Sequence, residues 1–157
     1  MRAVRLSGSM LREMQAHARA SYPEECCGFL IGASSSTEPA DERTVLSTER
    51  AGNEYDGERR RRFLIPPDEL RLVERRLENA GRAVVGFYHS HPDHPARPSQ
   101  FDQEHAWPWY SYLVLSVTAD EVPAVGAFEL DEDSGVFRQV ALTVLEDSVT
   151  SPPLARG

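Results

Sequence analysis

The stretch RAVVGFYHSHPDHPARPSQFD, residues 82–102, decides how this 157-residue chain is organised. Its first part is almost entirely apolar up to residue 88, which is typical of a strand buried in the middle of a sheet. Its second part carries three histidines, two aspartates and three prolines. A central strand is therefore predicted to run directly into a loop rich in side chains that can bind a metal.

The two histidines nearest the strand are separated by one residue. In extended backbone, His89 and His91 project from the same face, so both rings can bind one Zn²⁺. Pro92 then ends the strand. Ser99 and Asp102 form the pattern of a capping box at a helix start, but Asp102 could also turn its carboxylate toward the histidines. Two histidines, a carboxylate and an open position are typical of a catalytic zinc site.

Hydrolysis at such a site also needs a general base. Glu24 and Glu25 precede the apolar segment CCGFLIG, residues 26–32, where a carboxylate can be held rigidly beside a core. Strand alternation sends the two glutamates in opposite directions, so only one can face the histidines. Cys26 and Cys27, the only cysteines, are predicted to be small buried side chains, because adjacent residues of a strand rarely form a disulfide.

The composition excludes several classes of protein. The net charge of −8 disfavours a general binder of nucleic acid or of anionic membranes. No apolar run approaches the ~20 residues of a membrane span, and no signal peptide is visible, so we expect a cytoplasmic protein. The length favours a single domain over residues 1–147, followed by a disordered tail over 148–157.

Hydrophobic periodicity and turn residues predict a mixed α/β (α+β) domain with a central β-sheet flanked by helices. Pro67 and Gly81 are the expected start and stop of the clearest helix. Residues 50–62 are expected to form a polar loop. Helices are predicted over 7–21, 67–80 and 99–107, and strands over 26–32, 43–48, 62–65, 82–91, 111–117, 123–130 and 135–142.

Three short patterns together resemble the JAMM motif of the MPN-plus metallopeptidases, the Mov34/MPN/PAD-1 family. They are Glu-x-x-Gly at 25–28, His-x-His-Pro at 89–92 and Ser-x-x-Asp at 99–102. The resemblance extends over roughly residues 5 to 145 and is greatest to the compact bacterial members. It implies an MPN/JAMM-like, cytidine-deaminase-like fold, with a central mixed β-sheet flanked by helices.

The resemblance also implies a role for each motif residue. One Zn²⁺ per chain would be held by His89, His91 and Asp102. Glu25 would take a proton from the attacking water and pass it to the leaving amine, and Ser99 would hydrogen-bond the developing oxyanion.

Some neighbouring residues are expected to stand outside the catalytic set. His94 is expected at the rim of the site, and His105 to pack or cap a helix. The run Arg59 to Arg62 is either a solvated loop or a contact for an acidic partner. The aromatic residues from 107 to 112 are expected mainly to pack, with a substrate rim as the alternative.

The implied activity is that of a peptidase or isopeptidase acting after the C-terminal Gly-Gly of a ubiquitin-like protein. For the compact bacterial type, the implied partner is a β-grasp sulfur carrier whose tail is trimmed. Three alternatives remain: a deubiquitinase-like or desampylase-like isopeptidase, a non-catalytic MPN scaffold, and a zinc hydrolase of small molecules. The oligomeric state and the tail sequence of the substrate do not follow from the sequence.

Overall fold

The long strand predicted from the opening stretch, β5 (Arg82–Pro92), lies inside a six-stranded sheet of order β4-β2-β5-β6-β7-β8 in the computed structural model. β5 pairs antiparallel with β2 (Cys27–Ala33) and parallel with β6 (Ser111–Val117). Residues 84–92 are all buried, as expected of a central strand. The mixed α/β class predicted from the sequence is confirmed.

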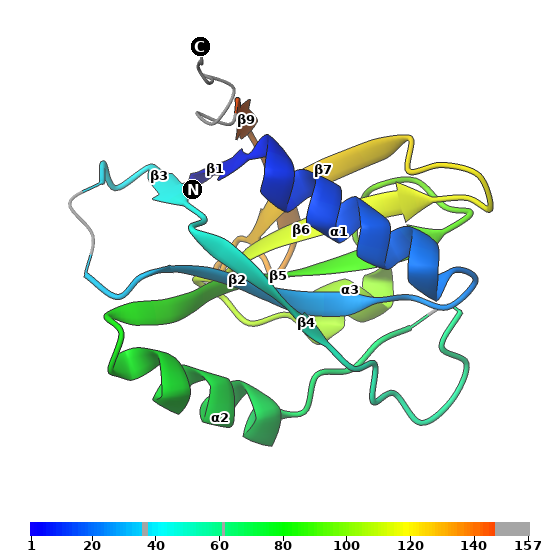
Figure 1. Cartoon of the computed structure of the whole chain (residues 1–157), viewed down its shortest axis with the longest axis horizontal. Helices are drawn as coiled ribbons and strands as arrows, with labels where there is room; N and C mark the ends of the chain where they lie inside the picture. Colours follow the sequence, from blue (N-terminus) through cyan, green and yellow to red (C-terminus); the bar gives the residue numbers. More distant parts are fainter. Residues whose placement is uncertain (36–37, 61, 147–157) are drawn as a thin grey trace, which may run out of the picture.

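The structure describes residues 1–35, 38–60 and 62–146 (Figure 1). The predicted disordered tail, 148–157, lies outside the described residues, and the single domain over 1–147 stays a prediction. The remaining elements are β1 (Ala3–Ser7), α1 (Gly8–Ser21), β3 (Glu42–Thr44), β4 (Ser47–Ala51), α2 (Pro67–Glu78), α3 (Gln100–Glu104), β7 (Ala124–Leu130), β8 (Phe137–Val140) and β9 (Leu142–Leu145). Among the described residues, no helix has the length and apolar character needed to cross a bilayer.

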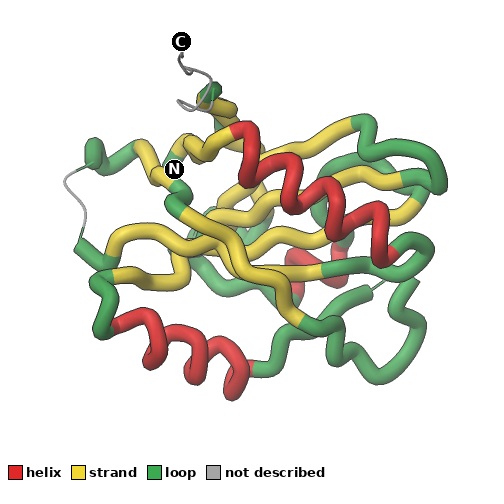
Figure 2. Tube along the Cα trace, in the orientation of Figure 1, coloured by secondary structure: helices red, strands yellow, loops and turns green. Residues whose placement is uncertain are grey.

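The two longest helices cover opposite faces of the six-stranded sheet (Figures 1 and 2). Because side chains alternate along a strand, the sheet supplies a separate apolar surface to each helix. Met14 and Ala18 of α1 pack in one core with Leu30, Tyr88, Leu113 and Leu115. Leu70, Val73 and Leu77 of α2 pack in the other core with Phe29, Phe87 and Val114.

The local signals at the helix ends are those expected. Ser7 caps α1, since its Oγ accepts a hydrogen bond of 3.2 Å from the backbone N–H of Met10. Pro67 occupies the first turn of α2. Gly81 has a φ of +69°, a left-handed conformation that glycine adopts without strain, and it follows the end of that helix.

Five elements differ from the sequence prediction, and in the strands that do form, the pairing partners decide the difference. The predicted helix over 99–107 is shorter, because α3 ends at Glu104 and His105 caps it. Residues 62–65 form no strand; they pass over the sheet as irregular backbone. The predicted strand 43–48 is divided between β3, which pairs with β1, and β4, which pairs with β2. The predicted strand 135–142 is divided between β8 and β9. β1 was not predicted, and with β3 and β9 it forms a second, parallel sheet.

Gly86 allows β5 and β6 to approach closely, and a substitution there tests this pairing. A methyl group at Gly86 would overlap the backbone carbonyl of Ser111, the residue opposite it in β6. We expect Gly86→Ala to lower the free energy of unfolding by about 1–3 kcal/mol, the usual cost of overpacking. Thermal and urea unfolding measure the change.

Gly52→Ala is the matched control. Gly52 is exposed, and an added methyl there would meet only the carboxylate of Glu54, which can move away. Equal unfolding free energies for Gly86→Ala and Gly52→Ala would contradict the close approach of β5 and β6.

Candidate active site

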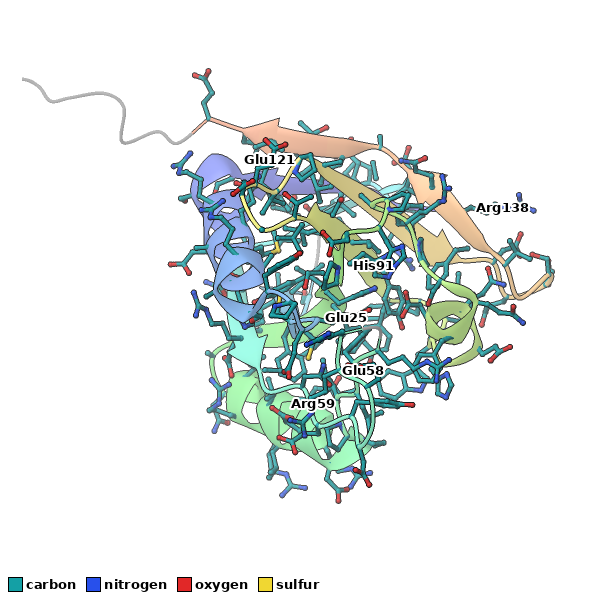
Figure 3. The ribbon with its side chains drawn as sticks, turned by 90° about the vertical axis from the view of Figure 1, so that its right-hand side faces the viewer. Glu25, Glu58, Arg59, His91, Glu121 and Arg138 are labelled. Carbon is teal, nitrogen blue, oxygen red and sulfur yellow. The ribbon has the colours of Figure 1, made fainter. Side chains whose placement is uncertain are left out.

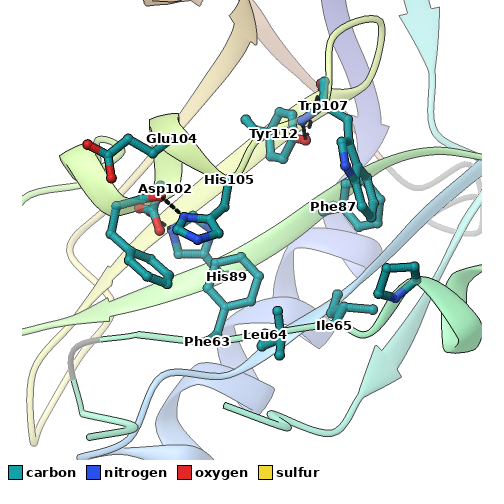
Figure 4. Close-up of a pocket in the computed structure, with 13 residues that line it drawn as sticks. Phe63, Leu64, Ile65, Phe87, His89, Asp102, Glu104, His105, Trp107 and Tyr112 are labelled. Atoms are coloured by element: carbon teal, nitrogen blue, oxygen red, sulfur yellow. Dashed lines mark hydrogen bonds and ion pairs between the residues drawn. The ribbon is translucent and has the colours of Figure 1, made fainter. Parts of the chain in front are cut away.

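The end of β5 carries the two predicted histidine ligands. Their Nε2 atoms lie 3.3 Å apart, and both side chains are almost completely buried. The ring of Phe63 stacks on His89 with centroids 4.4 Å apart (Figure 4). The Nδ1 atom of His91 lies 3.2 Å from the carbonyl oxygen of Pro95. Both rings are therefore held with Nε2 directed to one point.

Asp102 is brought to the same point by the segment that connects β5 to β6. Its Oδ2 lies 3.0 Å from Nε2 of both His89 and His91, and it accepts a 2.8 Å hydrogen bond from the N–H of Ser99. The Ser99 hydroxyl accepts in return from the N–H of Asp102 at 3.1 Å. The capping box predicted from the sequence is present, and it is the same geometry that aims the carboxylate at the histidines.

The two neighbouring glutamates differ in burial, but not through strand alternation, because both lie in irregular backbone before β2. Glu25 is buried, with 4% of its surface exposed, whereas Glu24 is exposed. Ligand atoms of Glu25, His89 and His91 all lie within 4.8 Å of one another. Figure 3 shows Glu25 and His91 close together. The structure thus brings Glu25, and not Glu24, to the histidines.

The backbone of Glu25 is held from two sides by residues to which the sequence analysis gave no such role. Asn53 donates from Nδ2 to the carbonyl oxygen of Glu25 at 3.1 Å, and the N–H of Glu25 donates to the carbonyl oxygen of Arg59 at 2.7 Å. On the other side, the N–H of Cys26 donates to Oγ of Ser90 at 2.9 Å. The position of Ser90 between the motif histidines could have indicated its role. Asn53 lies in a polar loop, where no sequence pattern indicates its contact with Glu25.

The two buried carboxyl groups have opposite electrostatic environments. Burial and the charge of Asp102 raise the pKa of Glu25 to about 9, although Arg62 opposes this. Burial also disfavours ionisation of Asp102, but His89 and hydrogen bonds from both histidines and from Ser99 hold its pKa well below the usual range. Burial lowers the pKa of His89. The site therefore contains a neutral imidazole at His89, an ionised carboxylate at Asp102 and a carboxyl group at Glu25 that can hold a proton.

The convergence of these atoms fits a bound metal ion. Two imidazole nitrogens and one carboxylate oxygen lie within 3.3 Å of one another, and that donor set suits a divalent cation. Among the described residues, Oε1 of Glu25 and Nδ1 of His89 are buried without a hydrogen-bond partner. Unpaired buried polar atoms are rare away from functional sites. The structure therefore supports a metal-binding cluster, without identifying the ion.

The other candidate residues lie where the sequence analysis expected them. His94 is exposed, and it lines a polar hollow with His91 and Ser99. His105 ends α3 and stacks on Phe101 with centroids 4.0 Å apart. Cys26 and Cys27 are buried and free. Tyr112 packs on Phe87 with centroids 5.6 Å apart, as expected for the aromatic residues after the motif.

Two hollows adjoin the cluster. The first, of about 420 Å³, is mainly apolar and includes His89 and Asp102 in its wall (Figure 4). Its apolar lining consists chiefly of Phe63, Leu64, Ile65, Phe87, Phe101, Trp107 and Tyr112. The second, of about 390 Å³, is polar and is lined by Glu25, Arg62, His91, His94, Pro95, Arg97, Pro98, Ser99, Gln100 and Phe101.

Several known proteins are similar to this chain in sequence, and others in both sequence and fold. Desampylase of Haloferax volcanii is 38% identical over 109 residues, which cover 69% of this chain and 73% of the relative. CysO-cysteine peptidase of Mycobacterium tuberculosis is 30% identical over 115 residues, covering 73% of each chain.

Two solution structures cover almost the whole chain. A protein from Desulfitobacterium hafniense has a TM-score of 0.76 and 28% identity, covering 94% of this chain and 96% of that one. A protein from Salinibacter ruber has a TM-score of 0.66 and 32% identity, covering 95% of each. The family described as prokaryotic homologs of the JAB domain matches residues 7–130. The chain belongs to this family, which confirms the family predicted from its motif.

Proposed function

We propose that this protein is a zinc-dependent peptidase that cleaves the bond after the C-terminal Gly-Gly of a ubiquitin-like protein, and that its substrate is a β-grasp sulfur carrier. The observation that carries the proposal is the meeting of His89, His91 and Asp102 beside the buried, unpaired Oε1 of Glu25. The names of the relatives, desampylase and CysO-cysteine peptidase, support hydrolysis at a protein carrier.

The ligands of the metal in this proposal are His89, His91 and Asp102. When bound, Zn²⁺ supplies Lewis-acid polarisation of the scissile carbonyl and activation of the attacking water. Asp102 suits a ligand because three neighbouring groups favour its ionised form. His91 is oriented by the carbonyl of Pro95, as ligand histidines commonly are. His89 is oriented instead by the ring of Phe63.

Glu25 is the general base and acid in this proposal. Its Oε1 takes a proton from the attacking water and delivers it to the leaving amine nitrogen, so the scissile C–N bond breaks without release of an amide anion. Asn53 and the carbonyl of Arg59 fix the backbone that carries Glu25. The Ser99 hydroxyl accepts from Asp102 and has its own proton left to donate to the oxyanion.

The second candidate function is that of an isopeptidase that releases a ubiquitin-like modifier from a lysine. The name of the desampylase relative favours it, and the reacting groups would be the same. The cytoplasmic location expected from the sequence stays a prediction, as does the monomeric or oligomeric state of the enzyme.

Cleavage is tested by intact-mass spectrometry of two substrates incubated with the zinc-loaded protein. One is a β-grasp sulfur carrier extended beyond Gly-Gly, and the other is the same carrier linked to a lysine side chain. We expect the first to lose the mass of its extension, and a chelator to prevent this. If the zinc-loaded protein leaves both substrates unchanged, the proposed function is wrong.

Substitution of the proposed ligands should remove the metal. We expect His89→Ala, His91→Ala and Asp102→Ala to lose most of the one zinc ion bound per chain, because each removes one of three protein donors. Elemental analysis of the purified proteins measures this, and circular dichroism checks the fold. His94→Ala is the control, because His94 is an exposed histidine near the same site. Equal zinc content in His89→Ala and His94→Ala would refute the ligand assignment.

The two adjacent glutamates provide a matched test of the base. Glu25→Gln should keep the zinc and the fold but reduce kcat by about 10²–10⁴-fold, the usual contribution of general acid–base catalysis. Glu24→Gln should retain full activity, because Glu24 is exposed and does not belong to the group of Glu25, His89 and His91. Steady-state kinetics on the extended carrier measure both variants. An inactive Glu24→Gln together with an active Glu25→Gln would reverse the assignment.

A further inference from the structure

The polar hollow beside the cluster is the place for the leaving group of the reaction. This step rests on the proposed function. A proton passes from Glu25 to the leaving nitrogen only if the two groups are within hydrogen-bond reach. Glu25 lines the polar hollow and does not line the apolar one. The chain that departs with that nitrogen must therefore occupy the polar hollow, next to Glu25.

The charge of this hollow is unusual for an acidic protein. Among the described residues that line it, two are arginines, Arg62 and Arg97, and Glu25 is the sole carboxylate. Neither arginine is among the described residues that form ion pairs, although the charge of Arg62 lowers the pKa of Glu25. His94 lines the same hollow. The chain as a whole has a net charge of −8. Positive charge is thus concentrated where the leaving group must lie.

One of the two guanidinium groups is held in position. The guanidinium carbon of Arg62 lies 4.7 Å from the ring centroid of Phe101, a cation–π contact, and its Nη1 donates to the hydroxyl of Tyr55 at 3.3 Å. Phe101 is held in turn by the ring of His105. Arg97 comes two residues after Pro95, whose carbonyl oxygen orients His91. The side chain of Arg97 is exposed. Planar guanidinium groups recognise carboxylates through paired hydrogen bonds.

We propose that Arg62 and Arg97 form a binding site for the free C-terminal carboxylate of the leaving residues. Hydrolysis breaks the C–N bond after Gly-Gly: the hydroxyl of water joins the carbonyl carbon, and its proton joins the leaving nitrogen. When one or two residues leave, their carboxylate lies within this hollow, whose 390 Å³ is at the small end of ligand pockets. A lysine that leaves from within a protein brings no free carboxylate there. The site therefore selects short C-terminal extensions over lysine conjugates.

The test compares two substrates that differ in one group. A β-grasp sulfur-carrier domain ending in Gly-Gly-Ala is prepared with a free carboxylate and, by ligation, with a terminal amide. We expect the zinc-loaded enzyme to cleave the acid with a kcat/KM about tenfold or more above that of the amide, the effect of a hydrogen bond to a charged group. In Arg62→Gln and Arg97→Gln this ratio should fall toward 1, because the acid loses a partner for its carboxylate. Arg62 also lowers the pKa of Glu25, so its loss changes the cleavage of both substrates, and that common change cancels in the ratio.

Arg60→Gln is the matched control, because Arg60 lies in the same loop and does not line the hollow. It should keep the preference of the unchanged enzyme for the acid. Equal cleavage of acid and amide by the unchanged enzyme would overturn the carboxylate site and leave the proposed function standing. Failure to cleave either substrate would count against the proposed function.

A second measurement does not depend on turnover. The peptide acetyl-Gly-Gly-Ala, as free acid and as amide, is titrated into the isotope-labelled protein, and the side-chain Nε–H signals of the arginines are followed by NMR. The acid should shift the signals of Arg62 and Arg97 while that of Arg60 stays in place, and the amide should shift none of them. Identical responses to acid and amide would overturn the proposal whatever the kinetics show.

Discussion

The parallel pairing of β5 with β6 is the constraint on which the rest of the site depends. A tight turn can join antiparallel strands, but a parallel pair requires the chain to leave one end of the sheet and cross back to the other. The crossover between Pro92 and Ser111 begins where β5 delivers His89 and His91. It contains α3, whose first turn directs Asp102 back to both histidines. The ligand set is therefore a consequence of strand direction.

The antiparallel pairing of β2 with β5 supplies the remaining catalytic group. In this register Cys27 lies opposite His89, so the residues just before β2 meet the end of β5. Ser90 reinforces the contact, since its backbone N–H donates to the carbonyl of Cys26 and its hydroxyl accepts from the N–H of Cys26. Glu25 is thus placed beside the histidines by two strands and by the loop that contains Asn53.

Hydrogen bonding gives the two buried carboxyl groups different chemistry. Asp102 faces two histidine nitrogens and a backbone N–H, all of which favour its anion. Glu25 is even more deeply buried, but its Oε1 has no partner among the described residues, and the neighbouring anion of Asp102 disfavours a second negative charge. Pairs of titratable groups whose environments separate their pKa values are typical of acid–base catalysis. The two neighbouring hollows also differ in character. The one that includes His89 has aromatic walls, and the one that includes Glu25 is lined by arginines.

The sequence by itself determined the features that depend on local pattern: the central strand, the helix that begins at Pro67, and the spacing that places His89, His91, Ser99 and Asp102 together. Apolar periodicity, caps and short spacings act between residues close in the chain, so they can be predicted without the fold. Only the tertiary structure decided that Phe63 stacks on His89, that β9 joins β1, and that Asn53 holds Glu25. Each of these depends on a partner distant in sequence, and neither a short strand nor a single amide carries enough local signal to specify such a partner.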